Sequence, residues 1–221
     1  MSTGAIARPK SRSRGQTRAA VGFVAAVVLL GVMAWDTKVV KIGADGVAAV
    51  PGTFVAAQFG QSEFPKVQAA VTEKAVDAAT LAAAIAKDPA AAAKQYGVQA
   101  PGGDAFAYPV KLTGTAGKSD LGVYDLQVPG LPDGFKVQVQ SGPAINGTAL
   151  RDVPGTIGFG QFKNQIEFQN AGSALNKEMK KQVLSKVDVT NLTGKTLEVV
   201  GAFETNDPKT WLVTPVKLGV Q

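Results

Sequence analysis

The feature that most constrains this 221-residue chain is a change of sequence period at Pro101-Gly102-Gly103. Before the break, apolar residues recur at helical spacing, and after it apolar and polar residues alternate one by one. The segment Phe135–Gln140 shows this best, because every second residue is apolar and its neighbours are Lys or Gln. Such alternation is typical of a strand with one buried face. The sequence therefore predicts an α+β chain, with a helical layer over residues 36–100 and a β domain over residues 101–221.

The β domain is predicted to hold short antiparallel strands and one helix. Turn chemistry separates strands at Pro132-Asp133-Gly134 and Asn206-Asp207-Pro208. A helix capped by Asn170 or Ser173 and running to about Val187 carries an apolar stripe. Short antiparallel strands with one helix inserted late favour a small β-barrel of the oligonucleotide/oligosaccharide-binding (OB) type, and a β-sandwich is the alternative. The expected strands are 108–115, 121–128, 135–140, 156–162, 197–203 and 211–218, with 144–152 as a further strand or a loop.

The layer over residues 36–100 is rich in alanine. It opens with a short strand over residues 35–43. Thr53 is placed to cap a helix that begins near Phe54, and Asp88-Pro89 combines an N-cap with a proline in the first turn of another helix. Gly97 is a stop signal for that helix. Alanine favours helix but buries little surface, so we expect these helices to pack thinly against something larger.

Residues 19–35 contain neither a charged residue nor a proline. At about 1.5 Å per residue a helix of this length spans ~26 Å, which is at the short end for a bilayer. Residues 1–18 are polar and basic, and we expect a disordered cytoplasmic tail there. The sequence thus predicts a single-pass signal anchor in the cytoplasmic (inner) membrane and a periplasmic, extracytoplasmic C-terminal domain. A signal peptide cleaved after Ala34 stays the alternative.

The charge distribution argues against a nucleic-acid partner. Five of the 23 basic residues and none of the 17 acidic ones lie in residues 1–35, so the rest of the chain carries 18 basic and 17 acidic residues. A phosphate-binding face would show as clustered Lys and Arg in the body of the protein. The chain also has no histidine and no cysteine, which excludes disulfides, imidazole and thiolate metal sites, and His-based catalysis. We expect a protein that is not an enzyme and has no cofactor.

The densest run of polar side chains among strand-forming residues extends over 146–168. Arg151 and Asp152 are the residue types that clamp sugar hydroxyls or anions, but they also form braces within a fold. Gln165 and Glu167 alternate with apolar residues and are expected to point outward or into a cleft. The ligand-binding candidates are therefore Arg151, Asp152, Gln165 and Glu167.

Three further residues in this run are assigned structural roles. Asn164 shares a face with apolar neighbours, so it should hydrogen-bond to the backbone. Gly158 and Gly160 lie within an expected strand and should mark a bend or a close backbone approach.

A hydrolytic carboxylate pair of Asp152 and Glu167 is the enzymatic alternative. No Asp-rich loop of the kind that binds calcium is present.

Three motifs carry a resemblance to a known family. They are WDTKVVKIGADG at residues 35–46, GTALRD at 147–152, and FGQFKNQIEF at 159–168 followed by a helix with Asn176. The chain resembles, from about Trp35 to its C-terminus, the exported proteins grouped as domain of unknown function 2291. Many members are described as periplasmic lipoproteins with a lipidated cysteine after the apolar segment. This chain has no cysteine, so its apolar helix would have to replace the lipid as anchor.

The resemblance implies a role but no activity. Family members are often encoded beside ABC transporters for sugars, so it implies a transport-associated protein of the cell envelope. We expect a membrane-anchored, non-enzymatic accessory that assists a sugar ABC transporter or binds a small molecule. A structural envelope protein that contacts other proteins through its helical layer is the alternative.

Overall fold

The computed structural model describes residues 53–101, 104–205 and 207–221. The predictions for the tail (1–18), the anchor (19–35) and the strand over 35–43 lie outside these residues. Of the helices that are described, none is both long and apolar enough to cross a membrane. The described residues fall in one compact unit, Pro51–Gln221.

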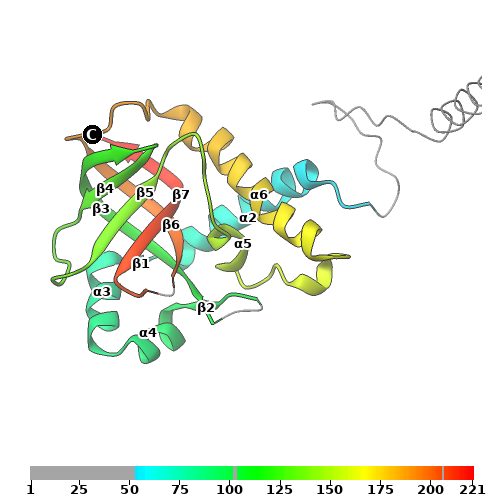
Figure 1. Cartoon of the computed structure of the whole chain (residues 1–221), viewed down its shortest axis with the longest axis horizontal. Coiled ribbons are helices and arrows are strands. Elements are labelled where there is room, and N and C mark those ends of the chain that lie inside the picture. Colours follow the sequence, from blue (N-terminus) through cyan, green and yellow to red (C-terminus); the bar gives the residue numbers. More distant parts are fainter. Residues whose placement is uncertain (1–52, 102–103, 206) are drawn as a thin grey trace, which may run out of the picture. The chain divides into compact units, whose positions relative to one another are not determined.

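Five strands pair in a closed ring (Figure 1). Its order is β3–β4–β5–β7–β6, and β6 returns to β3 over a register that runs from Phe106↔Thr205 to Thr115↔Thr196. Two short strands, β1 (Val76–Asp77) and β2 (Val98–Gln99), add to β3. The ring strands are β3 (Phe106–Asp120), β4 (Val123–Gln127), β5 (Lys136–Gln140), β6 (Thr196–Thr205) and β7 (Thr210–Val220).

The expectation of purely antiparallel strands is wrong at one pairing within the ring, and the short β1 also pairs parallel with β3. Strands β5 and β7 run parallel, with Val137 opposite Trp211 and Val139 opposite Val213. The long connection after β5 returns the chain to the ring through β6, so β7 follows the same direction as β5. Parallel neighbours need such a crossover. The single ring also replaces the β-sandwich that was the alternative.

The interior of the ring is a continuous apolar core. Val137 and Val139 of β5 point into it while Lys136 is exposed, as the alternation predicts. Three aromatic rings stack across it, because the ring centroids of Tyr108 and Phe203 are 5.2 Å apart and those of Phe203 and Trp211 are 4.6 Å apart. Burial raises the pKa of the Tyr108 hydroxyl.

Three helices precede the ring: α2 (Ala56–Lys74), α3 (Ala78–Lys87) and α4 (Pro89–Tyr96). The prediction for α4 is confirmed, since the Asp88 side chain accepts hydrogen bonds from the first turn and Gly97 ends the helix. The expected start of α2 is wrong: Val55, not Thr53, is in the N-cap position. Helices α3 and α4 pack Leu81 and Ile85, with alanines, into the core of the ring.

A second core lies outside the ring. Helix α2, the short α5 (Ala149–Asp152) and α6 (Gln165–Gln182) contribute to it, and Figure 1 shows α2, α5 and α6 together on one side of the strands. Phe64 and Val67 of α2 meet Leu175 of α6 there, against Ala202 and Val216 of β6 and β7. The helices are therefore attached to the sheet more firmly than their alanine content suggested.

The structure corrects the predictions for residues 146–168. The segment expected as a strand at 156–162 contains a 3₁₀ helix, Phe159–Gln161, and pairs with no strand. A Cβ at Gly158 or Gly160 would meet nothing within 4 Å, so these glycines mark no close approach. Helix α6 begins at Gln165, earlier than the expected caps at Asn170 or Ser173, because Asn164 already caps it.

Gly201 provides a test of the ring geometry. It lies at a register shift in β6, where an added Cβ would be 2.5 Å from the Thr214 carbonyl oxygen and 2.7 Å from a Val213 methyl carbon. We expect Gly201→Ala to lower the free energy of unfolding by about 1–3 kcal/mol because the backbone must shift. The matched control, Gly158→Ala, should change it by less than about 0.5 kcal/mol. Urea unfolding measures both, and equal effects would contradict this packing.

Candidate functional site

Arg151 and Asp152 form a buried ion pair within α5. Arg151 Nε donates to Asp152 Oδ1 at 2.7 Å, and Nη2 donates to Oδ2 at 2.9 Å. The contact is thus bidentate, the strongest form of a guanidinium–carboxylate pair. Nη1 donates to the backbone carbonyl of Phe168 at 3.3 Å. Both residues are almost fully buried, so the pair points into the protein.

Phe168 completes the surroundings of this pair. Its ring lies against the guanidinium, with Arg151 Cζ 3.6 Å from the ring centroid, and it belongs to the first turn of α6. The cation–π contact and the hydrogen bond to the Phe168 carbonyl together hold α5 to the start of α6. Of the two interpretations that the sequence left open, a ligand clamp and a brace, the geometry favours the brace.

The other candidates lie at the start of α6, on a helix and not on the expected strand. The Asn164 side chain accepts from the Glu167 amide at 2.9 Å, and Glu167 Oε2 accepts from the Lys163 amide at 2.9 Å. The first bond satisfies an amide donor that the helix N-terminus leaves unpaired, and the second ties Glu167 to the backbone just before the helix. Gln165 is exposed in the same turn. The four predicted ligand-binding residues divide into a buried pair and a helix start, and none of them lines the cavities described below.

The outer face of β4 and β5 is the surface that OB folds commonly use for ligands. Here Gln138 Nε2 donates to Asp125 Oδ1 at 2.7 Å, and Lys136 Nζ lies 3.7 Å from the same oxygen. These polar groups already pair with one another across the two strands. Binding of single-stranded nucleic acid relies on aromatic platforms and a positive groove, which Asp125, Lys136 and Gln138 do not provide.

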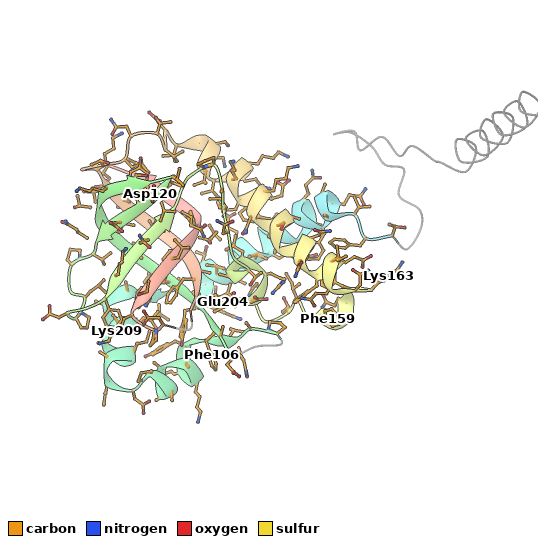
Figure 2. The ribbon with its side chains drawn as sticks, in the orientation of Figure 1. Phe106, Asp120, Phe159, Lys163, Glu204 and Lys209 are labelled. Carbon is orange, nitrogen blue, oxygen red and sulfur yellow. The ribbon has the colours of Figure 1, made fainter. Side chains whose placement is uncertain are left out.

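A cavity of about 610 Å³ lies between the β3–β4 turn, the segment after β5 and the C-terminal end of α6. Asp120, the last residue of β3, marks this end of the ring in Figure 2. The volume lies within the range of roughly 300–1,000 Å³ that is typical of small-molecule sites. Leu184 and Val189 supply apolar lining. The polar lining comes from Ser119, Ser141, Lys180, Ser185 and Thr190.

Two glycines in contact shape one wall of this cavity. Gly122 has a φ of +80°, and a Cβ there would lie 1.9 Å from the Gly142 Cα. A side chain at either position would separate the β3–β4 turn from the segment after β5. The Ser141 amide and hydroxyl both donate to the Gly122 carbonyl, at 2.8 and 3.1 Å. The wall is therefore built from backbone held at contact distance.

Hydrogen bonds hold the remaining walls in place. Lys180 Nζ donates to the Pro143 carbonyl at 2.7 Å, which links α6 to the segment after β5. Tyr124 Oη lies 3.3 Å from the carbonyl oxygens of Val189 and Thr190. The hydroxyl and amide of Thr190 donate to Asp188, and these bonds lower the pKa of its exposed carboxyl group. The loop after α6 is thus pre-shaped without a ligand.

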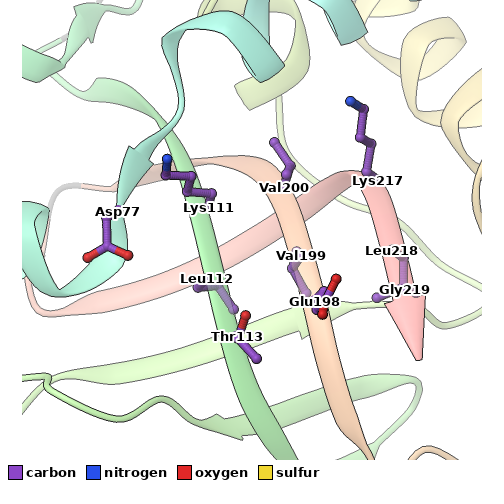
Figure 3. Close-up of a pocket in the computed structure, with 10 residues that line it drawn as sticks. All are labelled: Asp77, Lys111, Leu112, Thr113, Glu198, Val199, Val200, Lys217, Leu218 and Gly219. Carbon is purple, nitrogen blue, oxygen red and sulfur yellow. The ribbon is translucent and has the colours of Figure 1, made fainter. Parts of the chain in front are cut away.

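A second hollow of about 440 Å³ lies on the outer face of β3, β6 and β7. Val200 of β6 stands between Lys111 and Lys217 on the neighbouring strands, and Figure 3 shows both lysine side chains extending toward the same side. Glu198 and Gly219 form the next row of cross-strand partners. This hollow is a shallow stretch of charged sheet surface.

Sequence reasoning did not find the residues of the 610 Å³ cavity. Its walls come from three segments that are far apart along the chain, near residues 119–124, 141–143 and 180–190. The local signal available was Ser141-Gly142-Pro143, a break after a clear strand, which predicts a turn and nothing more.

The brace interpretation of Arg151 has a direct test. Asp152→Asn leaves a buried guanidinium without its counter-charge, so we expect a loss of about 3–5 kcal/mol in the free energy of unfolding. Asp125→Asn is the matched control, because its partner Lys136 is 3.7 Å away and both side chains are more than half exposed. The control should cost less than about 1 kcal/mol. Urea unfolding measures both, and a small loss for Asp152→Asn would contradict the brace.

Comparison with solved structures supports the ring topology. The chain is similar to an OB-fold protein from Thermotoga maritima, known from a crystal structure, with a TM-score of 0.62 and 17% sequence identity. The match covers 76% of this chain and 99% of that one. The predicted α+β architecture with an OB fold is confirmed at this level. Among curated proteins, none matches the chain.

A family model described as "Predicted periplasmic lipoprotein (DUF2291)" matches residues 23–219. This span includes all three motifs that carried the resemblance, and it covers both the helices and the ring. The description agrees with an extracytoplasmic location. The chain belongs to the family of domain of unknown function 2291, the predicted periplasmic lipoproteins.

Proposed function

We propose that this protein is a non-enzymatic, extracytoplasmic binding module that takes a small ligand into the 610 Å³ cavity at the end of α6. The cavity carries the proposal, because it has the volume of a small-molecule site and walls that hydrogen bonds hold open. A pre-formed site loses less conformational entropy when it binds a ligand than a flexible one does.

The lining suits a small polyhydroxylated ligand such as a sugar. The Ser119 hydroxyl can donate and accept hydrogen bonds, and the Lys180 ammonium adds a donor at the rim. The hydroxyls of Ser185 and Thr190 donate to the Lys181 carbonyl and to Asp188, so they offer a ligand acceptor lone pairs. Leu184 and Val189 offer an apolar floor for the C–H faces of such a molecule. Most cavities of this size combine a mainly apolar wall with a few polar groups that orient the ligand.

The engagement of the carboxylates supports a non-enzymatic role. Asp152 is held by both nitrogens of a bidentate arginine contact, and Glu167 accepts a backbone amide at the start of α6. The bidentate contact leaves Asp152 unavailable as the general acid or nucleophile of a hydrolase, and the amide contact engages one oxygen of Glu167. The chain also has no histidine and no cysteine, so imidazole and thiolate, two of the most common catalytic groups, are absent from its sequence.

The same proposal includes a membrane tether, formed by residues 19–35, and a protein partner. Residues 19–35 anchor the protein in the cytoplasmic membrane as a single helix with its N-terminus in the cytoplasm, in place of the lipid that the family description implies. A tethered ligand-binding module of this size is suited to assist a sugar ABC transporter. Co-purification of transporter subunits with the full chain from native membranes tests this part.

Filling the cavity tests the ligand site. Ser119 is exposed and lines the cavity, whereas its neighbour Lys118 is exposed and does not. A panel of mono- and disaccharides should contain a compound that raises the melting temperature of the wild type, since a ligand at 100 times its Kd stabilises by about 2.7 kcal/mol. We expect Ser119→Trp to abolish the rise and Lys118→Trp to retain it.

A second, independent test of the ligand site compares Lys180→Ala with Lys177→Ala on the same helix. Lys177 is exposed and lies outside the cavity. We expect Lys180→Ala alone to weaken ligand binding in calorimetry. No thermal response to any sugar, or equal responses from Ser119→Trp and Lys118→Trp, would contradict the proposed site.

A further inference from the structure

An aromatic patch lies at the start of the described chain. We group in it Phe54, Phe59, Phe159 and Phe162, whose rings contact one another directly or through Phe168. We add Ile166, which follows Phe162 by four residues in the first turn of α6. Phe54, Phe59 and Phe162 form a triangle with ring centroids 5.3–5.6 Å apart. Phe159 packs on the buried Phe168 at 5.7 Å. The patch thus combines the entry to α2 with the loop that leads into α6.

This patch is unusually exposed for its composition. Phe159 is 46% exposed and Ile166 is 69% exposed. Among the large apolar residues of the described chain, Leu121, at 83%, is the only other exposed one. Two of these three lie seven residues apart, in the loop before α6 and in its first turn. Phe54, Phe59 and Phe162 are half-buried. Exposed apolar side chains gathered in one region mark an interaction site.

The position of the patch along the chain indicates what covers it. Phe54 belongs to the patch and directly follows the eighteen residues, 36–53, that separate it from the end of the apolar segment at Trp35. Eighteen residues reach at most about 65 Å when fully extended. The patch is therefore the part of the domain that lies nearest to the apolar segment along the chain. The family description as predicted periplasmic lipoproteins agrees with attachment to a membrane.

We propose that the aromatic patch rests on the outer surface of the lipid bilayer, with Phe159 and Ile166 inserted into its interfacial region. Aromatic and aliphatic side chains at the headgroup boundary gain free energy from burying apolar area there. Lys163, labelled in Figure 2, follows Phe159 by four residues in the loop before α6, and its positive charge suits anionic headgroups. This inference rests on the tether of the proposed function and adds an orientation to it.

The same contact leaves the ligand cavity accessible. The cavity is built around the C-terminal end of α6, while Ile166 lies in the first turn of that 18-residue helix. At about 1.5 Å per residue the two ends are separated by roughly 25 Å. A contact of the bilayer with the aromatic patch therefore does not cover the cavity.

Single-cysteine labelling of the full chain tests the docking, because the native sequence has no cysteine. Ile166→Cys and, as a matched exposed apolar control, Leu121→Cys are labelled with an environment-sensitive fluorophore. Each is reconstituted into phosphatidylethanolamine–phosphatidylglycerol vesicles that contain nitroxide lipids. We expect a blue-shifted and quenched emission at position 166 and neither at position 121. Adding Phe159→Ser to Ile166→Cys should reduce the quenching.

The outcomes separate the docking from the tether. A chain that floats with the vesicles but shows equal, water-like emission at both positions would overturn the docking and leave the tether intact. A blue-shifted emission at position 166 without quenching, which becomes water-like when the protein is diluted in lipid, would show that a second copy of the chain covers the patch. That result would also overturn the docking on lipid. A chain that does not float with vesicles would overturn the tether, and the docking with it.

Discussion

The double pairing of β3 is the constraint on which the rest of the structure depends. Its first ten residues pair with β6 and its last part pairs with β4, with Thr115 bonded in register to both neighbours. A strand that changes partner along its length must bend, and Gly114 allows this because a Cβ there would lie 2.7 Å from the Gln127 carbonyl oxygen. The bend closes the ring and separates an inner core from an outer one.

The ion pair of Arg151 and Asp152 has a structural role at the edge of the outer core. Helices α2 and α6 need a defined position on the strands, and α5 meets the start of α6 through a guanidinium that is bonded on three nitrogens and covered by Phe168. Buried ion pairs contribute little net stability, but they specify one arrangement among several apolar ones. The polar residues that resembled a ligand clamp therefore set the position of α6, whose other end forms the cavity.

Local patterns predicted the elements well where each one has a single buried face. The alternation in β5 and the Asp88-Pro89 helix start were readable because their signals lie within a few residues. The glycine alternation at 156–162 was misleading, since Ile157 and Phe159 pack against helices instead of a neighbouring strand. The parallel pairing of β5 with β7 and the cavity at the end of α6 join segments that are distant along the chain, so no local pattern contains them.

The parallel pairing of β5 and β7 also bears on export. Strand β7 is the last ring strand in the chain, and it alone joins β5 to β6, so the ring stays open until residues 210–220 are present. Such distant pairings form slowly and leave apolar strand surface exposed meanwhile. A domain whose residues 210–220 cross a membrane last therefore cannot close its ring before translocation is complete, which keeps it in the extended form that a translocation channel accepts.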